Sequence, residues 1–212
     1  MHIEPGFVSA TKIAIANAAA AGLLGRHALG LFKSPQLVIR TVLAALAFTL
    51  FMQSFSAPAG PSELHFVGAM PMYLILGFAP TLLGFGVGLL LQGLLFEPAD
   101  LVHLGVNTLT LAIPLVVLHY TLGRHLRTRD IRSIVKLDAT FYAGVTLMVG
   151  FWLAFGEQAT TLSAWPAFVT AYGPLVLIEP VITLAFVKLL QPLADHPLGR
   201  LCTALGKPAT SV

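Results

Sequence analysis

Seven long apolar runs divide this chain, with turn residues and charged residues between them. The runs cover residues 9–30, 36–55, 66–77, 80–96, 105–122, 134–155 and 166–191. Because a helix needs about 20 predominantly apolar residues to cross the hydrocarbon core of a bilayer, the pattern predicts seven transmembrane helices. The third run is short and must be tilted or buried by its neighbours, and Pro80 is expected to separate it from the fourth.

Composition places the chain among integral membrane proteins. Of its 212 residues, 57% are hydrophobic and 10% are charged, and the mean hydropathy is +0.86, whereas about a quarter of the residues of a soluble domain are charged. We therefore expect an all-α integral membrane protein with one domain: an external tip at 1–8, seven helices within 9–192 and a cytoplasmic tail at 193–212. The single cysteine, Cys202, excludes a disulfide framework and a multi-cysteine metal cluster.

The charges between the runs predict the orientation. With seven spans, only Lys12 falls on one side of the membrane, and the other side carries Arg26, Lys33, Arg40, Arg124, Arg127, Arg129, Arg132, Lys136, Lys188, Arg200 and Lys207. Basic loops favour the cytoplasm, so the C-terminus is expected in the cytoplasm and the N-terminus on the external side. The membrane is expected to be the cell (inner) membrane. Six spans would place the first two basic loops on opposite faces, so seven spans are preferred.

Three histidines share the predicted external side. They are His2, His65 and His103, and the same side carries the acidic residues Glu4, Glu63, Glu97, Asp100 and Glu157. An acidic surface that also carries imidazoles favours a cation arriving from outside.

The chain opens with Met-His, and its first ten residues contain no Lys or Arg. A secretory signal has a basic first region, so we expect Met1 to be the mature N-terminus with a free amine. The Met1 amine, the His2 amide nitrogen and the His2 Nδ1 could then chelate a metal, with His65 from an external loop as a fourth nitrogen ligand. Four nitrogens in a plane suit Ni²⁺ or Cu²⁺, and Co²⁺ is close in affinity. The alternative is that the Met-His start is an idle tail that binds metal only adventitiously.

Four stretches resemble the substrate-binding membrane components of cobalt and nickel energy-coupling-factor transporters, the CbiM/NikM family. They are the opening MHIEPGF, HFVGA at 65–69, LLLQGLLF followed by LGVN within 89–107, and IEPVIT at 178–183. The stretches occur in the family's order and with fitting spacing from residue 1 to about 190. One such motif is a weak signal, and four in register are a strong one.

The resemblance implies six core helices plus an extra N-terminal helix whose tip enters an external pocket. There Met1, His2 and His65 would hold Ni²⁺ or Co²⁺ as the transported substrate, and no organic cofactor is expected. The resemblance also implies a separate transmembrane coupling subunit and ATPase subunits, with a small accessory membrane subunit as a further partner. The lipid bilayer surrounds the chain, and no nucleic acid is expected to bind.

Three more residues are candidates for supporting roles. Asn107 could orient a liganding imidazole or cap a helix. His103 could be a transient ligand as the metal enters, or an interfacial side chain. Glu179 is taken as the one acidic residue well inside a predicted span, where a carboxyl group is costly; it could belong to a polar network near the site or be a neutral helix-packing acid.

The chain also departs from the family's pattern. Phe96 is followed by EPADLVH instead of a Gly-Asp-Gly-Gly turn, Thr110 stands where a second Asn is expected, and Tyr172 stands where a His is often found. These changes surround the expected site and leave the choice between nickel and cobalt open.

No Walker-type ATPase motif, Gly-x-Ser-x-Gly or His-Glu-x-x-His occurs in the chain. We therefore expect no enzyme, and the energy for transport must come from other subunits. Two alternatives stay open: a solitary metal permease or sensor of the same fold, and a membrane enzyme or assembly factor with a fortuitous Met-His start.

Overall fold

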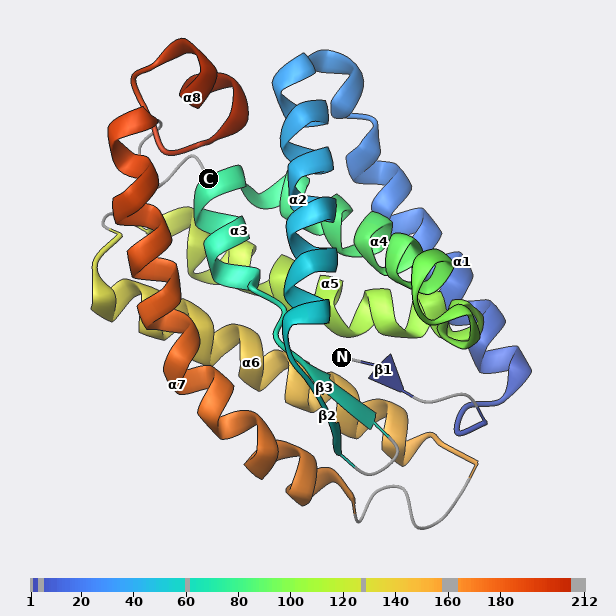
Figure 1. Ribbon diagram of the computed structural model, residues 1–212. Coiled ribbons are helices and arrows are strands. Elements are labelled where there is room, and N and C mark those ends of the chain that lie inside the picture. The colour runs from blue at the N-terminus through green and yellow to red at the C-terminus, as the bar shows by residue number, and fades with distance from the viewer. Residues whose placement is uncertain (1, 4–5, 60–61, 127–128, 158–163, 207–212) are drawn as a thin grey trace.

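The computed structural model is a bundle of helices with a small β-sheet at one end (Figure 1). It describes residues 2–3, 6–59, 62–126, 129–157 and 164–206. The α-helices are α1 (Ala10–Ala28), α2 (Pro35–Ser54), α3 (Ala69–Leu76), α4 (Phe78–Leu95), α5 (Leu104–Thr121), α6 (Ile131–Ala154), α7 (Trp165–Leu190) and α8 (Pro197–Cys202). The 3₁₀ helices are η1 (Leu31–Lys33), η2 (Pro98–His103), η3 (Gly123–His125) and η5 (Gln191–Leu193), and the strands are β1 (His2–Ile3), β2 (Ser56–Ala59) and β3 (Ser62–His65).

Each predicted apolar run contains a helix, in the order α1 to α7. Five helical segments are long and apolar enough to cross a membrane: Pro35–Ser54, Phe78–Leu95, Pro98–His125, Ile131–Ala154 and Trp165–Leu193. The helix α1 is not among these five, and α3 has only eight residues. A mostly helical chain with several apolar membrane spans is therefore confirmed, while seven crossings and the orientation of the termini stay predictions.

The break between the third and fourth predicted helices lies at Gly77 and not at Pro80. Gly77 has a φ of 96°, in the region that glycine adopts at little cost, and the chain turns there from α3 into α4. Pro80 lies in the first turn of α4, where a missing N–H removes no helical hydrogen bond. The predicted helix at 66–77 is also too long at its start, because β3 ends at His65 and α3 begins only at Ala69.

A three-stranded antiparallel sheet in the order β1-β3-β2 takes the place of the external loop expected before the third helix. β2 and β3 form a hairpin in which Ser56 pairs with His65 and Ala59 with Ser62. β1 adds to the free edge of β3. The purely helical prediction is corrected here, because pairing between residues 2–3 and 62–63 is a long-range contact that sequence periodicity does not reveal.

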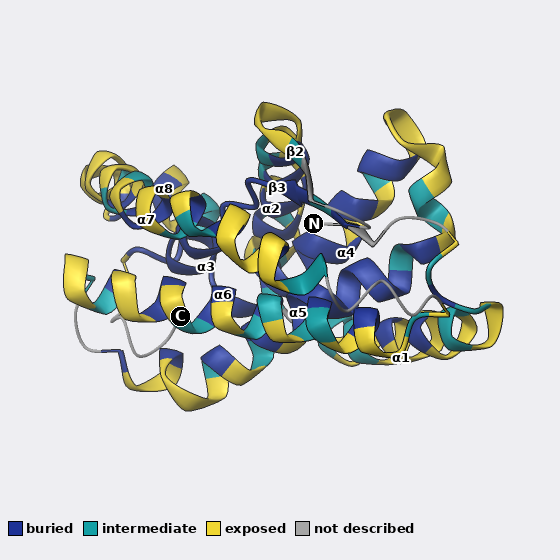
Figure 2. Ribbon diagram, turned by 90° about the horizontal axis from the view of Figure 1, so that it is seen from below, coloured by how far each residue is buried: buried dark blue, intermediate teal, exposed yellow. Residues whose placement is uncertain are grey.

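The interior of the bundle is formed mainly by α3, α4 and α5, whose residues are largely buried. Figure 2 shows exposed residues on the outer faces of α1, α6 and α7. Many of them are large and apolar, such as Leu147 and Leu177, whose exposed fractions are 66% and 77%. Wide exposed apolar surfaces mark membrane or protein contacts, and these faces have the chemistry that lipid tails require.

The predicted cytoplasmic tail folds back against α2 and α3 as far as residue 206. The buried Arg40 of α2 donates to the carbonyl oxygens of Leu201 at 3.2 Å and Arg200 at 2.5 Å, and the Ala204 N–H donates to the Ile75 carbonyl at 2.6 Å. Figure 1 shows α8 and the β-sheet at opposite ends of α2. Residues 193–206 are therefore part of the packed fold rather than a free tail.

Candidate metal centre

The N-terminal strand lies against the strand that carries His65. In the antiparallel pairing of β1 with β3, His2 is opposite Glu63 and Ile3 is opposite Ser62. His65 is two residues beyond Glu63 and so points to the same face of the sheet, and the His2 end of β1 is the end nearer to His65. Backbone pairing thus brings together two parts of the predicted chelate. Met1 and the side chain of His2 lie outside the described residues, so their roles as ligands stay predictions.

His65 is 3% exposed, and a contact of Nδ1 orients its ring. Nδ1 lies 3.2 Å from the Met52 carbonyl oxygen, and because a carbonyl can only accept, Nδ1 carries a proton. Nε2 lies 3.1 Å from Oε2 of Glu63. A second hydrogen bond that fixes the tautomer and the ring orientation is typical of metal-binding histidines, and here it leaves Nε2 as the nitrogen that a metal could take.

Glu63 is a neighbour of the site that sequence reasoning placed only among the external acids. The alternation of side chains along a strand puts Glu63 and His65 on one face, so recognising residues 62–65 as a strand would have found it. Its carboxyl group is a negative charge next to the imidazole, which favours a cation at this place.

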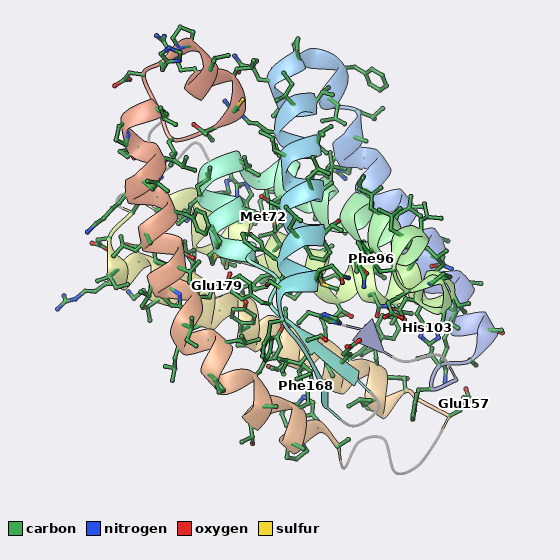
Figure 3. The ribbon with its side chains drawn as sticks, in the orientation of Figure 1. Met72, Phe96, His103, Glu157, Phe168 and Glu179 are labelled. Atoms are coloured by element: carbon green, nitrogen blue, oxygen red, sulfur yellow. The ribbon has the colours of Figure 1, made fainter. Side chains whose placement is uncertain are left out.

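His103 and Asn107 are buried residues of the two helical elements that contact β1. These elements are η2 and the start of α5, and the two residues are 0% and 1% exposed. Figure 3 shows His103 beside β1. The N-cap of α5 is His103, so Asn107 does not cap this helix. The structure brings both residues near the predicted site, and their action on the metal stays a prediction.

The segment that joins β1 to α1 is tied to the end of α6. The Glu157 N–H donates to the Phe7 carbonyl at 3.0 Å, and Lys12 Nζ donates to the Phe155 carbonyl at 2.6 Å and to Oε1 of Glu157 at 3.1 Å. The hydrogen bond from Lys12, together with its charge, lowers the pKa of the Glu157 carboxyl below its ordinary value. These contacts fix where α1 begins.

The helices α1 and α5 approach closely at Asn17 and Gly105. Oδ1 of Asn17 accepts the Gly105 N–H at 2.7 Å, and a Cβ at position 105 would lie 2.4 Å from that oxygen. The N–H groups of a first helical turn have no partner within their own helix, so Asn17 supplies the acceptor from α1. Sequence reasoning did not select Asn17, although a lone amide in the alanine-rich stretch AIANAAAAG is a signal for such a contact.

Glu179 accepts a hydrogen bond from a backbone N–H at the start of α3, the helix that follows His65. The carboxyl group is fully buried; its Oε1 accepts the Met70 N–H at 3.0 Å, and the Tyr142 hydroxyl donates to its Oε2. Gly68, the N-cap of α3, offers no side-chain cap, so a carboxylate from α7 binds the positive end of the α3 dipole. Glu179 therefore positions the chain that comes directly after the predicted ligand.

Comparisons with known proteins bear on this geometry. A family model described as "Cobalt uptake substrate-specific transmembrane region" (CbiM) matches residues 2–196. The chain belongs to the CbiM family. A protein of Haloquadratum walsbyi named "Putative metal transport protein" is 30% identical over 197 residues, which is 86% of each chain. A crystal structure of a transition metal transporter shares the fold, with a TM-score of 0.67 at 22% identity over 93% of this chain and 96% of the other.

Membership in CbiM makes this chain a multi-pass transmembrane component of metal uptake. Its departures from the family pattern have definite contacts. Oγ1 of Thr110 accepts from Nε1 of Trp152 at 3.0 Å, and the ring of Tyr172 packs against that of Tyr142 with 4.9 Å between centroids. The altered stretch after Phe96 forms η2, which carries His103 to β1.

A second buried carboxyl group, that of Asp138, lies in the CbiM chain where the sequence predicted none. Asp138 belongs to α6, inside the predicted span 134–155, and is fully buried. Glu179 is therefore joined by a second buried acidic residue, which lies near the start of its predicted span. Asp138 follows Lys136 in a basic stretch of sequence, which suggests an interfacial position, and only the packing of α6 against its neighbours buries it.

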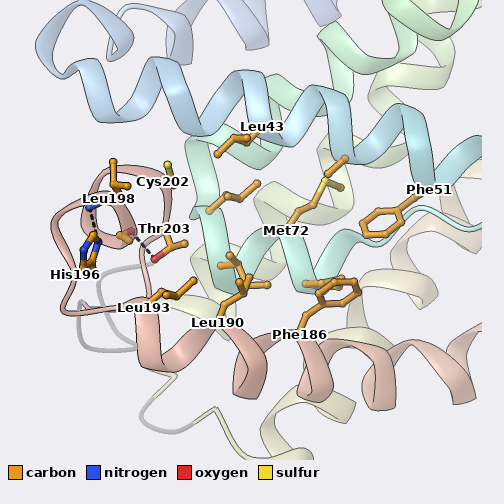
Figure 4. Close-up of a pocket in the computed structure, with 15 residues that line it drawn as sticks. Leu43, Phe51, Met72, Phe186, Leu190, Leu193, His196, Leu198, Cys202 and Thr203 are labelled. Carbon is orange, nitrogen blue, oxygen red and sulfur yellow. Dashed lines mark hydrogen bonds between the residues drawn. The ribbon is translucent and has the colours of Figure 1, made fainter.

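An apolar groove of about 580 Å³ between α2, α3, α7 and α8 is not the candidate metal site (Figure 4). Its lining is mostly apolar, and Nδ1 of His196 at one end already accepts the Leu198 N–H at 3.3 Å. Such a lining cannot replace the hydration shell of a divalent ion. In the described part of the chain, no group of three or more His, Cys, Asp or Glu is placed to hold a metal.

Proposed function

We propose that this chain captures Ni²⁺ or Co²⁺ outside the cell as the substrate-binding component of an energy-coupling-factor transporter in the inner membrane. Membership in CbiM supports metal uptake. The observation that carries the proposal is the pairing of β1 with β3, which brings residue 2 to the strand of His65. The chain binds and releases its substrate without making or breaking covalent bonds in it, so it is not an enzyme.

The proposed site holds the metal between the Met1 amine, the His2 amide nitrogen and imidazole, and Nε2 of His65. The Met52 carbonyl keeps the proton of His65 on Nδ1, which leaves the lone pair of Nε2 for the metal. When the metal takes Nε2, the Glu63 carboxylate, 3.1 Å from that nitrogen, remains beside it as a compensating negative charge. Nitrogen donors of this kind suit Ni²⁺ and Co²⁺ better than Mg²⁺ or Ca²⁺.

One way to release the metal is for the N-terminal strand to leave the sheet. Among the described residues of the N-terminal segment, only His2 and Ile3 pair with β3, and the next one bonded to another element is Phe7. Withdrawal of β1 is thus a local step that breaks few hydrogen bonds. Movement of the whole chain against its coupling subunit is the second way in which the site could open.

The coupling subunit and the ATPases are proposed to be separate chains, with a small accessory membrane subunit as a further partner. Support comes from the absence of an ATPase motif in the sequence. Metal uptake by cells that express this chain with and without candidate partner subunits tests the point. Uptake that needs the partners supports the proposal, and equal uptake without them would make the chain a solitary permease.

The metal site is tested by metal content and visible absorption of the purified protein. Protein with its native N-terminus is expected to retain about one equivalent of Ni²⁺ or Co²⁺ with the absorption band of a planar nitrogen site. One extra residue before Met1 acylates the amine, and His65→Ala removes the imidazole, so both changes should abolish retention. His196→Ala, which removes an exposed imidazole at the other end of α2, is the control. Equal retention by all four proteins would reject this site.

A further inference from the structure

A buried polar cluster behind α3 is not used by the metal centre. It combines Asp138 and Tyr142 from α6 with Tyr172, Glu179 and Thr183 from α7, and α7 packs against both α3 and α6. All five residues are at most 2% exposed. Asp138 and Tyr142 are four residues apart and therefore lie on one face of α6.

Of the two carboxyl groups in this cluster, only that of Glu179 accepts hydrogen bonds from described residues. Glu179 accepts from the Met70 N–H, from the Ala69 N–H and from the Tyr142 hydroxyl. Neither oxygen of Asp138 has a hydrogen-bond partner among the described residues, and each is shielded from solvent. The hydroxyls of Tyr172 and Thr183 are likewise buried and without a partner there.

No positive side chain faces the two carboxyl groups in the described part of the chain. The ionisable groups that act on one another are Asp138, Tyr142, Tyr172 and Glu179 themselves. The two other helices that pack against α6, α3 and α5, contain no Asp, Glu, Lys or Arg. Their ionisable side chains are Tyr73, His119 and Tyr120, and Tyr73 and His119 bond to each other at 2.9 Å.

Two ionised carboxylates cannot share such a site without a cation. An unpaired buried charge is so costly that the group binds a proton or a counter-ion instead, and like-charged carboxylates in one site do not both ionise. Glu179 keeps its charge, because three donors and the N-terminus of α3 stabilise it. Asp138 has no donor among the described residues, so its carboxyl group is the one that must be neutralised.

We propose that Asp138 is a proton-binding site in the membrane-spanning core of this chain. The carboxyl group of Asp138 carries one exchangeable proton, and Glu179 carries the single negative charge of the cluster. Glu179 joins the cluster to the start of α3, but Asp138 itself lies in α6 and its site requires no metal. It gives each molecule a second ligand site, for a proton, made of oxygen groups.

Infrared spectroscopy of the full-length, metal-free protein at neutral pH tests this assignment. A protonated carboxylic acid has a carbonyl stretching band that a carboxylate lacks. We expect this band in the wild type and its loss in Asp138→Asn, an isosteric and neutral replacement. Asp130→Asn, which changes an exposed aspartate on the same helix, should retain the band.

Isotope labelling keeps the test decisive if the variant fails to fold. The chain contains four aspartates, of which only Asp138 is buried. Carbon-13 in the aspartate carboxyl groups of the wild type should therefore shift the band. A wild type without the band, or a band that neither labelling nor Asp138→Asn affects, would overturn the proposal. One equivalent of a metal cation that resists chelation in the wild type and is lost in Asp138→Asn would also overturn it, because a cation would then balance the charge.

Discussion

Two polar sites lie on either side of Gly68 and are built in different ways. The site before Gly68 surrounds His65 and is completed by the pairing of a two-residue strand. The site after Gly68 surrounds Glu179 and is closed by three packed helices, α3, α6 and α7. The first site can open by a local movement, whereas the second can open only if the bundle separates. We therefore expect substrate exchange to occur at the first site, and the second site to contribute to stability.

The largest expected effect comes from a substitution that disrupts only the first site. His65→Ala should lower the affinity for Ni²⁺ or Co²⁺ by at least about 100-fold, since loss of even an outer-shell partner of a ligand costs 10- to 100-fold. The thermal unfolding midpoint of the metal-free protein should change little. Isothermal titration calorimetry and a melting curve measure the two quantities.

Asp138→Asn is the matched change in the second site, and it should leave metal affinity within about twofold of the wild type because the two sites lie apart. A loss of metal binding in Asp138→Asn as large as that in His65→Ala would contradict the separation of the sites.

The next largest effect comes from a substitution that disrupts the second site. Glu179→Ala leaves the buried N–H groups at the start of α3 without an acceptor, and we expect it to lower the free energy of unfolding by about 1–3 kcal/mol. Glu179→Gln keeps an acceptor oxygen, so it should cost less. Denaturation of both variants in detergent gives the comparison. Equal stability of the wild type and Glu179→Ala would show that the carboxylate does not support α3.

A smaller effect on metal affinity tests whether Asn107 belongs to the first site. Asn107→Ala should lower metal affinity by about tenfold if its amide orients a liganding imidazole. The chain has one other asparagine, Asn17, whose amide joins α1 to α5. Asn17→Ala is the control, because it should reduce stability more than the affinity of the folded protein. If Asn107→Ala leaves the affinity unchanged, Asn107 contributes only packing.

The smallest effect concerns the tie between the N-terminal segment and α6. Lys12 lowers the pKa of Glu157 in the folded protein, so this pair stabilises the fold above the ordinary carboxyl pKa of about 4.3 and loses its effect as the pH falls through the lowered value. The wild type should therefore lose slightly more thermal stability than Lys12→Met between neutral and strongly acidic pH. The difference should be small, because the pair is exposed to solvent. Identical pH profiles would show that the pair contributes nothing.

The sequence predicted the candidate ligands of the metal site but not the residues that surround them. Met1, His2 and His65 were selected from residue types and from the family resemblance, and the structure places His2 and His65 on paired strands. Glu63 and Asn17 were not selected, because their roles depend on strand alternation in an unrecognised sheet and on the crossing of α1 with α5. Neither contact has a sequence period of its own.

What the sequence by itself determined is the helical class, the ranges of the apolar helices and the family, because hydrophobic runs and local motifs are properties of neighbouring residues. Only the tertiary structure decided that β1 pairs with β3, that α3 shrinks to eight residues between Gly68 and Gly77, and that Asp138 is buried. The physical reason is the same in each case. Burial and pairing depend on which distant segment covers a residue, and a carboxyl group two residues from a lysine is interfacial or buried according to how its helix packs.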